Sequence, residues 1–170
     1  AFYPGSSIGN FNPGEAQAFL TRVQHLCAQA GAGSGILIGV DLVKATNVLE
    51  AAYDDALGLT GAFNLNLLRH INKLIGADFE VRDWQHIGLY NTQLSRIEMH
   101  VEAKRDVAVT WQDKGVTANR SFKAQERIHT ENSYKWTPEN FTDLLRKSGF
   151  ARTKMWTDSD QYFAVFWADF

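Results

Sequence analysis

The chain has 170 residues, of which 45% are hydrophobic and 21% charged, and this size and composition predict a single domain with one well-buried core. The net charge of -2, without a basic run, argues against nucleic acid as a partner, and no apolar run approaches the roughly 20 residues of a membrane span. Cys27 is the one cysteine, which allows no disulfide within the chain, so we expect a cytoplasmic protein.

Helical and strand-like patterns alternate along the chain. A short strand at its start leads into a turn rich in Gly, Ser, Asn and Pro. The spacing of apolar residues predicts helices over 15–30, 46–56, 60–75 and 137–148. Thr137 as N-cap and Pro138 at the first helical position mark the start of the last helix. Strand-like runs occupy 36–40, 84–90, 96–104, 107–111, 126–134, 153–156 and 162–168.

This order of elements predicts an α/β fold with two sheets. The run 36–40 is apolar throughout, which is typical of a strand covered on both faces, and its place after a strand and a helix indicates a parallel, doubly wound sheet. A closing helix with two strands would complete that sheet with an antiparallel edge. The middle strands alternate between apolar and polar residues and therefore indicate an additional, mostly antiparallel sheet.

Two features near the buried strand invite a functional interpretation. Gly31, Gly33 and Gly35 follow a helix and precede a strand, which is the reverse of the order in a dinucleotide-binding turn, so a flexible connection is favoured. Asp41 follows the strand 36–40 and would lie at the carboxyl edge of the sheet, where ligands bind in open α/β folds. Asp41 therefore either serves a ligand or caps the next helix.

The motifs of metal centres and hydrolases are not indicated. No pair of histidines sits at metal-ligand spacing with a Cys or an acidic partner, and the HExxH motif is absent, so we expect no metal site. The histidines are His25, His70, His86, His100 and His129. No serine stands in the strand-turn-helix setting that a nucleophile elbow needs.

Glu131 and Ser133 form the most informative pair of residues. They stand two positions apart in a run that we expect to be extended, and alternation then places both side chains on one face. A carboxylate acceptor beside a hydroxyl can hold the N–H of a small ligand such as an imidazole. The alternative is a surface strand that carries one acidic and one small polar residue.

Seven segments, in order along the chain, resemble one protein family. They are FYPGSSIGNF (2–11), GVDLVK (39–44), AYDDA (52–56), TGAFNLN (60–66), RIEMH (96–100), HTENSYK (129–135) and WTD (156–158). Together they are similar to the histidine-specific, S-adenosylmethionine-dependent methyltransferases. That family converts histidine into its Nα-trimethyl betaine, hercynine, in ergothioneine biosynthesis.

The resemblance implies how the chain is divided. Residues 1–57 and 136–170 would form the later half of a Rossmann-like methyltransferase sheet, and residues 58–135 would form the substrate-recognition region. The family is longer than this chain, and its amino-terminal half carries the main elements that hold S-adenosylmethionine. The chain would then be a carboxyl-terminal portion, inactive alone, whose partner is the missing amino-terminal half. Its unprotected first strand would also permit self-association.

The resemblance further implies roles for individual residues. Asn10 and Tyr53 would bind the carboxylate and amino end of histidine, Glu131 and Ser133 would hold the imidazole, and Thr60, Phe63 and Met99 would line the pocket. The base that deprotonates the α-amine is unassigned, and no metal takes part. Two alternatives stay open: a methyltransferase of the same fold acting on another amino acid, and an amino-acid-binding or inactive fragment that lacks the cofactor half.

Overall fold

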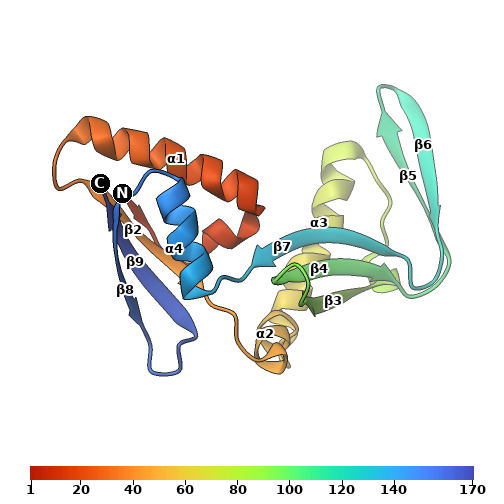
Figure 1. The fold of residues 1–170 in the computed structure, drawn as a ribbon. Helices are drawn as coiled ribbons and strands as arrows, with labels where there is room; N and C mark the ends of the chain where they lie inside the picture. The colour runs from red at the N-terminus through yellow and green to blue at the C-terminus, as the bar shows by residue number, and fades with distance from the viewer. The chain divides into compact units, whose positions relative to one another are not determined.

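Helices and strands follow the predicted order in the computed structural model, which describes residues 1–170 (Figure 1). In chain order they are β1 (Phe2–Tyr3), η1 (Ser7–Asn10), α1 (Pro13–Ala30), β2 (Gly35–Asp41), α2 (Thr46–Tyr53), α3 (Leu59–Ile75), η2 (Val81–Asp83), β3 (Trp84–Asn91), β4 (Arg96–Ala103), β5 (Val107–Asp113), β6 (Val116–Phe122), β7 (Arg127–Tyr134), α4 (Pro138–Lys147), β8 (Arg152–Thr157) and β9 (Phe163–Asp169). The prediction missed β6. The bounds of the other predicted strands and helices agree with the structure to within a few residues.

The chain divides into two units. The first comprises Ala1–Ala45, Asn91–Arg96 and Asn132–Phe170, and the second comprises Thr46–Tyr90 and Ile97–Glu131. The predicted segments 1–57, 58–135 and 136–170 divide the chain by function and not by contacts, and they stay a prediction. No helix is long and apolar enough to cross a membrane.

A four-stranded sheet in the order β1-β2-β9-β8 forms the first unit. β1 runs parallel to β2, whereas β9 runs antiparallel to both of its neighbours, β2 and β8. We had expected the antiparallel strand at the edge of the sheet. Instead, β9 lies inside the sheet, and β8 forms the edge. Burial explains this order, because alternate residues of β9 are buried whereas all six residues of β8 are exposed.

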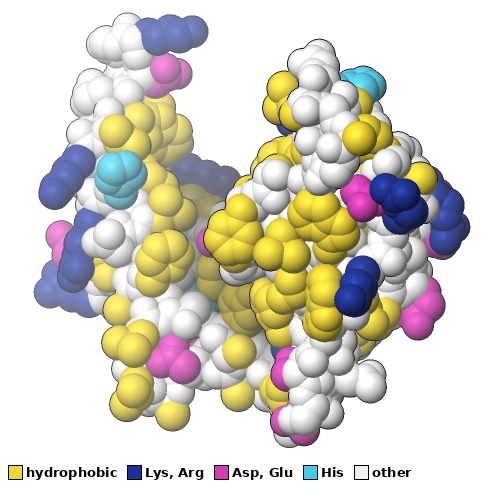
Figure 2. Space-filling model, turned by 90° about the vertical axis from the view of Figure 1, so that its left-hand side faces the viewer, with side chains coloured by type: hydrophobic (Ala, Val, Ile, Leu, Met, Phe, Trp, Pro, Cys, Tyr) yellow, Lys and Arg dark blue, Asp and Glu magenta, His cyan; other side chains and the backbone are white.

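The core of the first unit lies on one face of this sheet. Ile38 of β2 and Phe166 of β9 are register partners there, and both are fully buried with Leu20 of α1 and Phe141 of α4. The other face is less covered, and hydrophobic side chains gather on one side of this unit (Figure 2). β2 is thus covered less completely on this second face, where Gly35 and Gly39 are buried and Leu37 is half-buried.

Two smaller sheets form the strands of the second unit. One has the order β3-β4-β7, with the end of β7 reaching into the first unit, and the other is the antiparallel hairpin β5-β6. Leu68 of α3 is buried with Trp84 of β3 and Val101 of β4, which places α3 against the three-stranded sheet. The predicted α/β class with an additional, mostly antiparallel sheet is confirmed.

Candidate functional site

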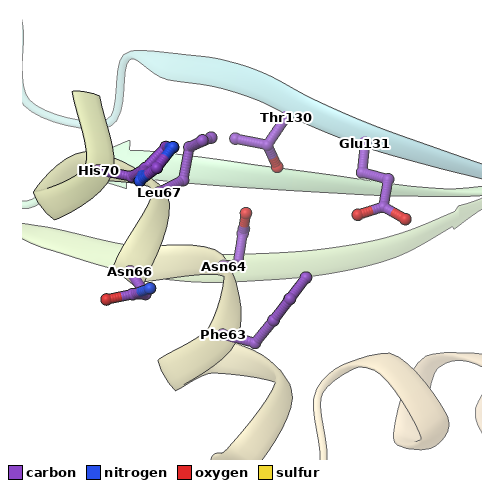
Figure 3. A pocket seen from close by; sticks show the side chains of 7 residues that line it. All are labelled: Phe63, Asn64, Asn66, Leu67, His70, Thr130 and Glu131. Atoms are coloured by element: carbon purple, nitrogen blue, oxygen red, sulfur yellow. The ribbon is translucent and has the colours of Figure 1, made fainter. Parts of the chain in front are cut away.

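A cavity of about 270 Å³ lies in the second unit between α3 and β7 (Figure 3). It is lined by Phe63, Asn64, Asn66, Leu67 and His70 of α3 and by Thr130 and Glu131 of β7. The Glu131 carboxylate points from β7 toward the helix, and the Phe63 ring extends from the helix toward it (Figure 3). The cavity thus joins an anionic acceptor to an exposed aromatic ring, since Phe63 is 69% exposed.

The start of α3 is held by Asp55. Its carboxylate accepts hydrogen bonds from the backbone N–H groups of Leu59 (3.0 Å) and Thr60 (2.8 Å). These bonds, with that of Thr60 foremost, lower the pKa of Asp55 to about 2. The sequence predicted that this helix begins at residue 60; α3 begins at Leu59, and Asp55 accepts hydrogen bonds from its first N–H groups. This cap directs the first turn of α3, which carries Thr60 and precedes Phe63.

Asn64 ties α3 to the sheet behind the cavity. It is 3% exposed, and its side-chain nitrogen donates to the His100 carbonyl (3.0 Å) and to Nδ1 of His86 (2.9 Å). Because Nδ1 of His86 accepts, its Nε2–H donates to the Tyr53 carbonyl at 2.7 Å. The chain of bonds from Asn64 through His86 thus fixes the backbone of Tyr53 at the end of α2. Sequence reasoning assigned no role to Asn64 or His86, although Asn64 stands inside a segment that carried the family resemblance.

Met99 lies in a buried cluster of the second unit and does not line the cavity. It is 4% exposed and belongs to a cluster with Leu49 and Ile97, against which Tyr53 and Tyr90 pack. Among the predicted site residues, the structure therefore brings Phe63 to Glu131 and brings Met99 to the cluster that holds Tyr53. Whether these residues bind substrate stays a prediction.

Ser133 belongs to a buried polar group in the first unit. It is 6% exposed, and its hydroxyl oxygen accepts from Nζ of Lys135 at 2.9 Å. The Lys135 side chain is fully buried and forms an ion pair with Asp41 at 2.8 Å. Asp41 also pairs with Lys44. The sequence left two interpretations of Asp41 open, a ligand contact or a helix cap. In the structure, the Asp41 carboxylate forms ion pairs with the ammonium groups of Lys44 and Lys135.

Asn10, the remaining predicted residue, ends η1 in the same unit as Ser133 and is exposed. A Cβ added to the preceding Gly9 would lie 2.9 Å from the Tyr134 carbonyl and 3.3 Å from the Ser133 hydroxyl oxygen. Glycine therefore permits η1 to pack directly on the end of β7. This contact brings the segment that carries Asn10 next to Ser133.

The glycine-rich turn before β2 connects the end of α1 to a strand. Gly31 and Gly33 have positive φ angles of 95° and 83°, and no side chain or backbone atom lies near the position of an added Cβ at either. At Gly35 an added Cβ would lie 2.3 Å from the Ala168 carbonyl, so this glycine serves the close packing of β2 on β9. The glycines thus provide a turn and a strand contact.

Comparison with known proteins gives a consistent result. The model of a family described as histidine-specific methyltransferase, SAM-dependent, matches residues 1–170. The histidine N-alpha-methyltransferase of Mycolicibacterium smegmatis is 39% identical over 156 residues, which cover 91% of this chain and 46% of that protein. The ergothioneine biosynthesis protein 1 of Neurospora crassa is 32% identical, over 93% of this chain and 17% of that protein. An N-methyltransferase of Aspergillus flavus is 28% identical, over 95% of this chain and 44% of that protein. The chain therefore spans about half the length of these relatives, or less.

Proposed function

The chain belongs to the histidine-specific, S-adenosylmethionine-dependent methyltransferase family, and we propose that the full-length protein methylates the α-amino group of histidine, giving hercynine. In this proposal the protein is cytoplasmic, and parts of it outside this chain supply the main binding elements for S-adenosylmethionine. The present chain contributes substrate recognition. The family match over residues 1–170 supports the reaction class, and the name of the mycobacterial relative supports histidine as the acceptor.

The observation that carries the proposed substrate is the Glu131 carboxylate in the cavity beside α3. An ionised carboxylate only accepts hydrogen bonds, so it matches the N–H of an imidazole. Phe63 offers an apolar wall of the same cavity, which suits the flat ring of histidine. A site that hydrogen-bonds its substrate in this way rejects amino acids that lack the N–H group.

Methyl transfer asks for alignment more than for reactive side chains. S-adenosylmethionine supplies an electrophilic methyl group, and the acceptor is an amine that attacks in line with the departing sulfur. Holding the amine in that orientation can contribute roughly 7–11 kcal/mol to lowering the barrier. The product is a permanent cation, and a ring such as Tyr53 or Phe63 would stabilise it by about 0.5–2 kcal/mol.

Replacing Glu131 tests the proposed substrate. In the full-length protein, Glu131→Ala and Glu131→Gln should each weaken histidine binding by about 1.5–3 kcal/mol, because a hydrogen bond to a charged group is lost. Calorimetry would measure the dissociation constants of histidine and of S-adenosylmethionine separately. Glu80→Ala is the control, since Glu80 is an exposed carboxylate of the same unit. Equal losses for both ligands, or no loss for histidine, would contradict the assignment.

A different acceptor amino acid is the second candidate function. The relative from Aspergillus flavus carries the name N-methyltransferase without a stated substrate, which favours testing acceptors other than histidine. Competition by a panel of aromatic amino acids against histidine would separate the two candidates. If another amino acid competes better than histidine, the fold and reaction class stand but the acceptor changes.

The behaviour of the chain by itself is a further part of the proposal. Expressed alone, it should show no methyl transfer, and calorimetry would measure its affinity for histidine. Size-exclusion chromatography would reveal self-association through the unpaired edge of β1. Turnover by the isolated chain would show that the cofactor elements lie within it.

A further inference from the structure

Three potential metal ligands converge on the three-stranded sheet of the second unit. Donor atoms of Glu98, His100 and His129 all lie within 4.8 Å of one another. We propose that these three side chains form a binding site for a divalent transition metal ion of the Zn²⁺ type. The site does not depend on the proposed methyl transfer, and sequence spacing did not predict it.

The register of β4 and β7 creates the cluster. Backbone hydrogen bonds join Lys135 to Ser95 at one end of the pair and Ala103 to Glu126 at the other, so the two strands run antiparallel. Glu98 and His100 stand two positions apart on β4 and therefore share a face. His129 comes from β7, and its ring stacks on that of His100 with centroids 4.7 Å apart. His129 is thus far from the other two residues in sequence but adjacent to them across the sheet.

The donor atoms, which all lie within 4.8 Å of one another, are somewhat farther apart than the ligands of a bound zinc ion. Bonds of about 2.0–2.2 Å in a tetrahedral arrangement place ligand atoms roughly 3.3–3.5 Å apart. Nε2 of His100 lies 3.9 Å from the Glu98 carboxylate, which is too long for a hydrogen bond and slightly longer than two ligands of one ion. Small rotations of the side chains would bring these atoms into range, and the backbone would stay in place.

Burial and a supporting hydrogen bond favour an ion at this position. The side chains of His100 and Glu98 are only 12% and 13% exposed, so both are set into the sheet. Nε2 of His129 lies 3.1 Å from the Glu131 carbonyl. When Nε2 donates to that carbonyl, Nδ1 carries the lone pair that a metal ion would take, and such a hydrogen bond from the other ring nitrogen is the usual support for a ligating histidine.

The ligand set indicates the class of metal. Two imidazoles and one carboxylate suit Zn²⁺, whereas Mg²⁺ and Ca²⁺ prefer oxygen ligands throughout. Three protein ligands leave one position of a tetrahedral ion for water. Because the ligands come from two strands, the ion would cross-link β4 to β7 beside Glu131.

Titration of the full-length protein with ZnCl₂ tests the proposal. Calorimetry in a weakly coordinating buffer, without free histidine, should show one equivalent of zinc bound, and MgCl₂ should give no binding. His129→Asn and Glu98→Gln should each lower the zinc affinity at least 10-fold, whereas His25→Asn, at an exposed position on α1, should leave it unchanged. Substitution with Co²⁺ should give the intense visible absorption of a tetrahedral site, and His129→Asn should remove it.

The folded His129→Asn variant decides whether these residues bind zinc. His129 is exposed, so its substitution is expected to leave the fold intact, and circular dichroism and the thermal midpoint of the metal-free variant would establish this. Zinc affinity that survives in a folded His129→Asn variant, or that falls equally in His25→Asn, would overturn the assignment. Binding of Mg²⁺ with the affinity of Zn²⁺ would also overturn it, because such a site would be a simple anionic surface.

Discussion

Asp41 and Lys135 should contribute unequally to folding stability, although they form one ion pair. The Lys135 side chain is fully buried, whereas that of Asp41 is 20% exposed and also pairs with Lys44. Asp41→Asn removes the countercharge of a fully buried ammonium, and breaking such a pair costs about 3–5 kcal/mol. Lys135→Met leaves Asp41 paired with Lys44 and removes a charge-assisted hydrogen bond of about 1.5–3 kcal/mol. We therefore expect losses of about 4 and about 2 kcal/mol, respectively.

Urea denaturation followed by tryptophan fluorescence would measure both values. With a slope m of about 3 kcal/mol/M, the midpoints should fall by about 1.3 M for Asp41→Asn and about 0.7 M for Lys135→Met. The double variant should be more stable than Asp41→Asn alone, because it no longer buries an ammonium without its carboxylate. Equal losses in the two single variants, or additive losses in the double variant, would refute the reasoning from burial.

Three further changes test other parts of the structure. Met99→Leu preserves the volume of a buried side chain, so it should cost less than about 1.5 kcal/mol, and an unchanged KM for histidine would remove Met99 from the predicted pocket. The pKa of Asp55 lies below its ordinary value, so its cap stabilises the fold fully above about pH 4 and loses this contribution as pH falls through about 2; urea midpoints of wild type and Asp55→Asn should converge there. Gly9→Ala must push η1 away from the Tyr134 carbonyl and should raise KM for histidine several-fold, whereas Gly14→Ala, where an added Cβ meets only a side-chain oxygen at 3.4 Å, should not.

Local signals predicted most of the fold. The start of α4 illustrates this, since Thr137 accepts from the backbone of Asn140 and Pro138 occupies the first turn, as the sequence indicates. α1 begins at Pro13, two residues earlier than predicted, because Asn12 and Glu15 form a capping box at its start. Such signals depend on neighbours within a few residues and can therefore be read from the sequence.

β6 was missed because its sequence lacks a buried face. Only Phe122 at its end is buried, and the other residues are exposed apart from the half-buried Ala118, so no apolar alternation marks the strand. Its signal is the turn: Asp113 pairs with Val116 across Lys114 and Gly115, which both have positive φ. A two-residue loop of this type joins hairpin strands, and attention to Lys114 and Gly115 could have predicted the strand.

The side-chain interactions of the candidate site were beyond pattern reasoning because they join distant segments. His86 contacts the carbonyl of Tyr53, which is 33 positions away in the sequence. Lys135 and Asp41 pair although they belong to two separate chain segments of the first unit. Periodicity assigns a residue to a face but does not name its partner on another element. The same limit hid the proposed metal cluster, since Glu98 and His100 lie on β4 whereas His129 lies on β7.

Glu131 shows how such distant contacts decide the meaning of a residue. Alternation along β7 is compatible with either a surface acid or a ligand acceptor, and the choice depends on what faces the strand. α3 faces it, and the position of α3 is set by the Asp55 cap at its start and by the bonds of Asn64 to His86 and to the His100 carbonyl. The cavity beside Glu131 is therefore a consequence of how α3 docks on the sheet. A carboxylate on the same strand without that docked helix would be an ordinary surface residue.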